Sequence, residues 1–316
     1  MSTKFAIGAL VQWNEIEILS EYVDTLLGAI DQYSKEDVLI DITLSTNQDL
    51  EQIEEDKSFL EILHDFYVQS NRLANYKANI NITDKLVTIS DYRRTFNTEY
   101  CTKADVLVWG ETDLLLPKEE FIVLDYLHKA STTSKYVATF GICKMWDDSW
   151  KALEHPEFTD KPFIENDHDN WWSVKYTMTK EEMYEINSRT ETPEVLALPQ
   201  HKFNGCGLVI SSEVIKAGVN IPQSVFFVHE DTAFMLMVQK ILGNIPQYSI
   251  RNILNVHNRN HLNKRMYVKG ESGDTMNKRR RSNSWYAKAN KFSEENCYNL
   301  FNPNYKSKTW KDVWQV

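Results

Sequence analysis

The sequence lacks the features that several common classes of protein require. Its cysteines are widely scattered and form neither a CxxC motif nor a Cys/His zinc spacing: Cys101, Cys143, Cys206 and Cys297. With no secretory signal, they predict reduced thiols in a cytoplasmic protein. The apolar run Phe5–Trp13 is too short to span a bilayer, and no later window is long enough to be a transmembrane helix. We therefore predict no transmembrane segment, and the composition remains compatible with a peripheral membrane contact.

Two glycine-rich signatures are also missing near the N-terminus. No GxGxxG follows the first predicted strand, which disfavours a nicotinamide enzyme. Residues Val11–Glu15 contain no glycine-rich loop bearing Lys or Arg, which counts against a nucleotidyltransferase that makes activated sugars. The formal net charge of -10 disfavours a nucleic-acid partner. From Lys264 onward basic residues outnumber acidic ones, and such a segment suits a phosphate-bearing partner.

The first part of the chain alternates predicted strands and helices. This order is typical of a parallel sheet with crossover helices, a Rossmann-like half. Asn14 and Glu17 form a capping-box pattern before the first helix. The predicted strands are Phe5–Gln12, Val38–Leu44, Leu86–Ile89 and the apolar run after Ala104, and the predicted helices lie over 19–30, 50–73 and 92–103.

The second part is less regular. Strands are predicted over Tyr136–Phe140, Gly205–Ser211 and Pro246–Ile250, and helices over 118–129, 180–187 and 232–242. We divide the chain into a first half (1–113), a second half (114–262) and a basic C-terminal extension (263–316). The predicted fold class is α/β, a mixed sheet flanked by helices.

The most informative motif is an acidic pair after a buried strand. The run Val106–Trp109 ends in Glu111 and Asp113, one residue apart. Residues two apart along an extended chain point the same way, so both carboxylates are expected to aim at one point beyond the strand. Ligands of open α/β sheets bind there, and oxygen ligands suit Mg²⁺ or Mn²⁺. The alternative is an ordinary strand end with two solvated acids.

The order of these motifs resembles the GT-A-fold glycosyltransferases, and within them the family 2 type. The matching residues are Glu111-Thr112-Asp113, the glycine-bearing run Gly205–Ser211 and the acidic pair Glu230-Asp231. The resemblance covers residues 4–260. It implies a GT-A-type sheet and a metal-dependent transfer of sugar from a nucleotide-sugar to a hydroxyl. It also implies that residues 1–113 are the nucleotide-sugar-binding half and residues 114–262 the acceptor-binding and catalytic half. The Gln-x-x-Arg-Trp motif of processive members is absent, which argues against a polymerising synthase.

The resemblance implies roles for the acidic residues. Glu111 and Asp113 would hold Mn²⁺ or Mg²⁺ against the donor diphosphate, and His257 would complete the metal site, with His261 as the alternative. Asp231 of the pair with Glu230 would be the base of an inverting reaction. Both acids also suit the N-terminus of the helix that follows.

The resemblance also places donor and acceptor residues. A nucleotide-sugar, with a UDP-sugar expected, would contact residues at the ends of the early strands and before the acidic motif: Val11, Asn14, Ser45, Asn47, Arg93, Arg94 and Glu111. Because adjacent helical residues diverge, one of the two arginines is expected to face solvent. Trp171, Trp172 and Asp169 would bind the acceptor, which is a glycan, a lipid-linked sugar or a protein.

The sequence departs from the family pattern at two places. The acidic motif begins with Glu111 where Asp is usual, and Ser45–Asn47 stand where the family often has an Asp that reads the base. These departures keep open a non-catalytic carbohydrate-binding protein on the same fold. The spacing does not decide between an inverting and a retaining reaction.

Overall fold

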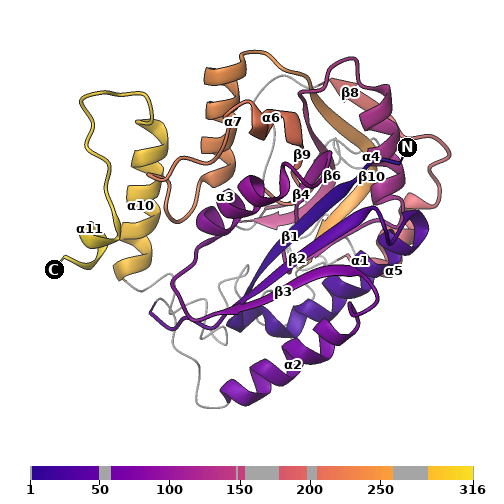
Figure 1. The fold of residues 1–316 in the computed structure, drawn as a ribbon, viewed down its shortest axis with the longest axis horizontal. Helices are drawn as coiled ribbons and strands as arrows, with labels where there is room; N and C mark the ends of the chain where they lie inside the picture. Colours follow the sequence, from indigo (N-terminus) through magenta and orange to yellow (C-terminus); the bar gives the residue numbers. More distant parts are fainter. Residues whose placement is uncertain are drawn as a thin grey trace.

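The computed structural model describes residues 2–49, 58–146, 149–153, 178–197, 205–258 and 284–315. One sheet runs through the molecule in the order β3-β2-β1-β4-β9-β6-β10-β5, with helices on both faces (Figure 1). Strands β7 and β8 pair with β6 and β10 respectively. The predicted class, an α/β mixed sheet flanked by helices, is confirmed.

The first half of the chain forms the parallel part of the sheet. Strand β1 joins β2 on one side and β4 on the other, and β2 joins β3. The elements are β1 (Phe5–Gln12), η1 (Trp13–Ile18), α1 (Leu19–Tyr33), β2 (Val38–Ser45), α2 (Phe59–Asn71), β3 (Lys77–Thr83), α3 (Ile89–Tyr100) and β4 (Val106–Trp109).

Two local predictions in this half are wrong. The third strand is Lys77–Thr83 and not Leu86–Ile89, because Thr88 caps α3 in a capping box with Asp91. Strand β3 lies at the sheet edge with little buried area, so its apolar signal is weak. Asn14 does not cap the first α-helix, since residues 13–18 form a 3₁₀ helix that buries Trp13 and Ile16.

The second half adds the antiparallel strands. Strand β9 pairs antiparallel with both β4 and β6, and β10 runs parallel to β6. The elements are β5 (Leu114–Leu115), α4 (Glu120–Ala130), β6 (Val137–Trp146), β7 (Ser149–Leu153), α5 (Lys180–Asn187), β8 (Val195–Ala197), β9 (Val209–Ser211), α6 (Ser212–Lys216), α7 (Glu230–Leu242) and β10 (Gln247–His257). Strand β9 is shorter than predicted, and β10 extends beyond its predicted end to His257.

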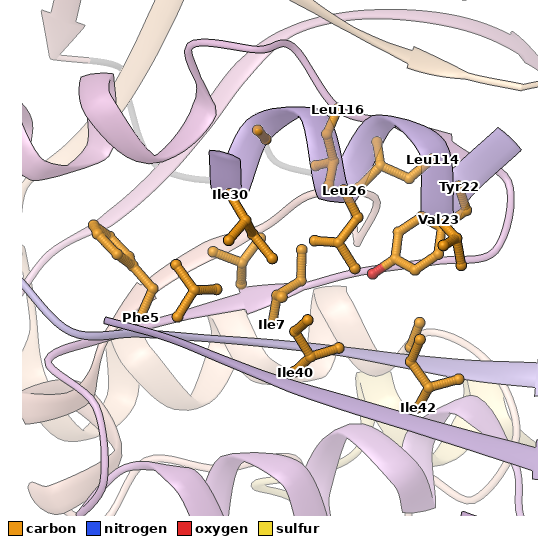
Figure 2. Close-up of a cluster of buried hydrophobic side chains, with 14 of the residues drawn as sticks. Phe5, Ile7, Tyr22, Val23, Leu26, Ile30, Ile40, Ile42, Leu114 and Leu116 are labelled. Atoms are coloured by element: carbon orange, nitrogen blue, oxygen red, sulfur yellow. The ribbon is translucent and has the colours of Figure 1, made fainter. Parts of the chain in front are cut away.

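Apolar side chains cover both faces of the sheet. On one face α1, α2 and α4 pack over β1 and β2, and Figure 2 shows Tyr22, Val23 and Leu26 of α1 above Ile7 and Ile40. On the other face α3, α6 and α7 pack around Leu107 and Trp109 of β4. Because β4 lies between two helix layers, its four residues are buried. The position at which the chain leaves the carboxyl end of β4 is therefore fixed.

The C-terminal helices support the segment that enters α7. Helix α10 (Ser284–Tyr298) and α11 (Trp310–Trp314) pack Trp285 and Val313 against Phe226 and Phe227. The Ser293 hydroxyl of α10 donates to the Val228 carbonyl at 2.5 Å. The C-terminal extension therefore holds the residues directly before Glu230-Asp231.

One buried acid makes stability depend on pH. Glu120 is fully buried, and neither carboxylate oxygen has a hydrogen-bond partner in the part of the chain that the structure describes. Burial raises the pKa of Glu120 well above its usual value, because it penalises the charged form. Stability is therefore highest below the unfolded pKa of about 4.3, where both states are protonated, and it falls as pH rises from there toward the folded pKa.

We expect Glu120→Gln to remove this loss. The free energy of unfolding of the natural protein should fall above about pH 5 by up to about 1.4 kcal/mol per pH unit, and the variant should show a flatter profile. Urea unfolding at several pH values measures the slope, and Glu119→Gln alters the adjacent carboxyl as a matched control. An unchanged slope in Glu120→Gln would contradict the assignment.

Candidate functional site

The chain that leaves β4 brings both acids of the predicted motif to one histidine. The His257 Nε2 atom lies 3.0 Å from Asp113 Oδ2 and 3.6 Å from Glu111 Oε2. His257 closes β10, where it pairs with Leu114 of β5, immediately after the acidic motif. The backbone N–H of Asn258 also donates to the Asp113 carbonyl, at 2.5 Å. Two carboxylates and an imidazole thus converge, as the metal prediction requires.

The local backbone differs from the extended chain that the spacing suggested. Glu111 to Leu114 form a turn, closed by a hydrogen bond of 3.0 Å from Leu114 N–H to the Glu111 carbonyl. Thr112, between the two acids, directs its hydroxyl to Glu15 at 2.8 Å. Glu111 and Asp113 reach the same point because β5 pairs with β10, and this pairing is a tertiary contact.

A cysteine completes the cluster. Ligand atoms of Glu111, Cys206 and His257 all lie within 4.8 Å of one another. Burial raises the pKa of the Cys206 thiol well above its usual range, and the carboxylates of Glu111 and Asp113 add to the shift. Sequence spacing missed Cys206 because it belongs to no CxxC motif and to no Cys/His zinc spacing. The only signal was its place between two glycines.

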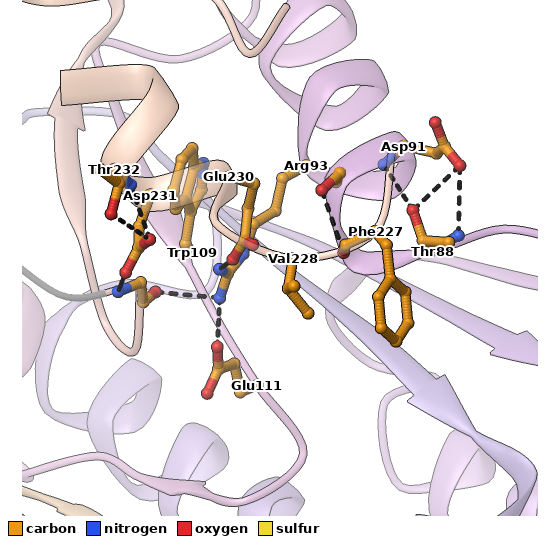
Figure 3. A network of polar contacts seen from close by, with 12 residues as sticks. Thr88, Asp91, Arg93, Trp109, Glu111, Phe227, Val228, Glu230, Asp231 and Thr232 are labelled. Atoms are coloured by element: carbon orange, nitrogen blue, oxygen red, sulfur yellow. Dashed lines mark hydrogen bonds and ion pairs between the residues drawn. The ribbon is translucent and has the colours of Figure 1, made fainter. Parts of the chain in front are cut away.

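Arg93 of α3 joins the two acidic motifs. Its guanidinium forms ion pairs with Glu111 and with Glu230, and it donates to the Gly205 carbonyl at 2.9 Å (Figure 3). The same group lies over the Trp109 ring, 4.7 Å from the ring centroid. The side chain is 2% exposed, so these contacts take place away from water. Arg93 therefore ties the end of β4 to the start of α7.

The pair Glu230-Asp231 opens α7 after a left-handed residue, His229, with φ 66°. Non-glycine residues seldom adopt this conformation, and it turns the chain sharply into the helix. Asp231 accepts hydrogen bonds from the backbone N–H groups of Gly205 at 2.9 Å and Thr232 at 2.6 Å. Burial raises the pKa of Glu230 to about 7, while the Arg93 guanidinium opposes the shift and Asp231 adds to it.

The predicted donor residues lie at adjacent strand ends. Val11 of β1 pairs with Leu44 of β2, so Ser45 follows beside it at the same edge of the sheet. Val11 and Ser45 are buried, and Asn47 donates to the Asp84 carbonyl at 2.9 Å. Asn14 lies in the 3₁₀ helix that leaves β1. Nucleotide binding by these residues stays a prediction.

One of the two arginines was expected to face solvent, and this prediction is wrong. Arg94 is half-buried and donates to the carbonyls of Ile221, Pro222 and Val225 at 2.8–3.0 Å. Neither arginine therefore has a fully exposed guanidinium. The acceptor residues Trp171, Trp172 and Asp169, and the alternative ligand His261, lie outside the described residues.

Comparison with known proteins finds resemblance in structure alone. No protein-family model matches the chain, and a search of curated sequences finds no match. Among solved structures, S. aureus TarS 1–349 has a TM-score of 0.48 and 10% identity over 95% of this chain and 72% of its own. GalNAc-T7 with UDP, GalNAc and Mn²⁺ has a TM-score of 0.48 and 11% identity, over 99% and 56% respectively.

A third solved structure is the mannosyltransferase PcManGT from Pyrobaculum calidifontis with GDP-Man and Mn²⁺. It has a TM-score of 0.47 and 10% identity, and the match covers 96% of this chain and 77% of the other. These structures are of the GT-A glycosyltransferase class, the class that the sequence motifs resemble. At such identities and TM-scores the resemblance carries no conclusion about the activity of this chain.

Proposed function

We propose that this chain is a metal-dependent, non-processive glycosyltransferase that moves a sugar from a nucleotide-sugar to an acceptor hydroxyl with inversion. One observation carries the proposal: Arg93 joins the cluster of Glu111, Asp113 and His257 to the acidic pair at the start of α7. A cation site for a diphosphate and a carboxylate able to take a proton are thereby held in one site.

The residues of the cluster fit a divalent cation. Carboxylate oxygens and an imidazole nitrogen are ligands for Mn²⁺ and related ions, and their 3.0–3.6 Å separations suit convergence on one ion. Asp113 and His257 would hold the ion, with Glu111 shared between the ion and Arg93. Once bound, the cation would offset the negative charge of the leaving diphosphate.

No helix in the described part of the chain is long and apolar enough to cross a membrane.

Asp231 is the proposed base. As the acceptor oxygen bonds to the anomeric carbon, the bond from that carbon to the diphosphate oxygen breaks, and its electron pair leaves with the nucleotide. The acceptor proton passes to the Asp231 carboxylate. Backbone N–H groups of Gly205 and Thr232 donate to that carboxylate and hold it in place.

Glu230, also predicted to be catalytic, has a different place in this proposal. Its carboxylate is engaged by Arg93, so Glu230 is assigned as a positioning residue for the acidic motif and for α7. Residues 1–113 would bind the donor, for which a UDP-sugar is proposed, and residues 114–262 would bind the acceptor. The acceptor is a glycan, a lipid-linked sugar or a protein.

Release of nucleotide from a panel of UDP-, GDP-, dTDP- and CMP-sugars tests the proposal. We expect one donor to be hydrolysed with Mn²⁺ or Mg²⁺ and not with EDTA. Asp113→Asn should lower the rate at least about 100-fold, because it removes a charged ligand. Asp31→Asn, which changes an exposed acid in the last turn of α1, is the matched control.

Two results would count against the proposal. Turnover that survives EDTA and Asp113→Asn would refute the metal assignment. Sugar binding with no release from any donor would instead favour a non-catalytic carbohydrate-binding protein on this fold, the alternative that the departures at Glu111 and Ser45 keep open.

A further inference from the structure

Cys206 occupies a position in the cluster that neither the predicted metal ligands nor the proposed base accounts for. Its sulfur lies within 4.8 Å of a ligand atom of Glu111 and of His257. This separation is close to what one divalent ion bridges, since its bonds to nitrogen, oxygen and sulfur are each about 2.0–2.3 Å long. The thiol is 4% exposed, so it belongs to the interior of the site.

The backbone on both sides of Cys206 is held by the site itself. Gly205 donates to Asp231 and accepts from Arg93, and a Cβ there would lie 2.4 Å from the Arg93 Nη1 atom. Gly207 has φ +68° and donates to the Trp109 carbonyl at 3.0 Å, while a Cβ there would lie 2.8 Å from Asn255 Nδ2. The two glycines permit close approaches that larger residues would prevent.

These constraints leave Cys206 little freedom. Strand β9 begins only three residues later and pairs with β4, whose end carries the acidic motif. The sulfur is therefore presented to Glu111 and His257 by the same strands that position those residues. A thiol placed in this way differs from Cys101, which is buried elsewhere and bonds to the Thr98 carbonyl at 3.4 Å.

We propose that the Cys206 sulfur is a ligand of the proposed cation and shifts the site's preference from Mg²⁺ toward softer divalent ions such as Co²⁺ and Zn²⁺. The inference rests on the proposed function, because it concerns the ion of that same site. Thiolate sulfur selects softer ions, whereas an all-oxygen site suits Mg²⁺. Cys206 would hold the ion as a thiolate, so its thiol proton would pass to solvent on binding.

Cobalt substitution tests the ligand directly and without turnover. Co²⁺ is added to the full-length, reduced protein, and the near-ultraviolet thiolate-to-cobalt charge-transfer band is recorded. The natural protein and Cys101→Ser should show the band, and Cys206→Ser and Cys206→Ala should lack it. Calorimetry should show that the ratio of Co²⁺ to Mg²⁺ affinity falls about 10- to 100-fold in the Cys206 variants.

The outcomes separate this inference from the proposed function. If Co²⁺ binds the natural protein without a charge-transfer band, Cys206 is not a ligand, and metal-dependent turnover can still stand. If the band appears and depends on Cys206 but no nucleotide-sugar is turned over, the ligand assignment holds and the proposed function fails. If no divalent ion binds the natural protein, both are overturned.

Discussion

Asp231→Asn is expected to lower the turnover number for sugar transfer by about 10²- to 10⁴-fold, the usual contribution of a general base. The amide cannot take the acceptor proton. It also leaves an NH₂ group facing one of the backbone donors, Gly205 or Thr232, that now bond to the carboxylate. Donor affinity should change little, because the proposed cation site is formed by other residues. Steady-state transfer rates together with donor titration measure the two effects separately.

Asp91→Asn is the matched control for that variant. Asp91 is likewise an acid in the first turn of a helix, and its carboxylate accepts from the Thr88 backbone and hydroxyl (Figure 3). Its loss weakens a helix cap by about 1 kcal/mol and leaves the proposed base untouched. A transfer rate near that of the natural protein in Asp231→Asn would remove Asp231 from the mechanism. An equal loss in Asp91→Asn would attribute the effect to folding.

Arg93→Met should lower the free energy of unfolding by about 3–5 kcal/mol, the cost of breaking a buried ion pair. The methionine leaves two carboxylates, Glu111 and Glu230, without the cation that now lies between them. Chemical unfolding measures the loss. Donor hydrolysis should fall as well, since Glu111 and the start of α7 lose their common support.

A second substitution distinguishes the charge from the packing of Arg93. Arg93→Met combined with Glu230→Gln removes one of the uncompensated buried charges and should regain part of the lost stability. Arg72→Met, which breaks a partly exposed pair with Asp24, is the matched control and should cost within about 1 kcal/mol. If Arg93→Met is as stable as Arg72→Met, the ion pairs of Arg93 do not hold the two motifs together.

Local patterns predicted the regular elements of this chain with good accuracy where burial is strong. Strand β1 and helix α5 have the bounds that were expected, because their apolar periodicity or polar caps are unambiguous. The edge strand β3 escaped prediction because it alternates around small and polar residues. The residues after Gln12 were expected to cap an α-helix, yet burial of Trp13 and Ile16 favours a 3₁₀ turn there.

The residues of the candidate site likewise divide into those that local sequence could select and those that only tertiary contacts reveal. Glu111 and Asp113 could be selected from sequence because a buried strand ends beside them, and His257 because the motif resemblance implied a late histidine ligand. Cys206 could not, because the atoms that face it come from the ends of β4 and β10. Arg93 was predicted to contact nucleotide, and its contacts with both acidic motifs became visible only in three dimensions.

The sequence by itself determined the alternation of strands and helices, the acidic strand end and the order of the motifs, because these depend on local periodicity and residue type. The tertiary structure decided which side chains meet. Pairing of β5 with β10 brings His257 to Asp113, and packing of α3 against β4 places Arg93 between two carboxylates. The contacts of His257 with Asp113 and of Arg93 with Glu230 join residues more than a hundred positions apart, and no local preference of the chain encodes them.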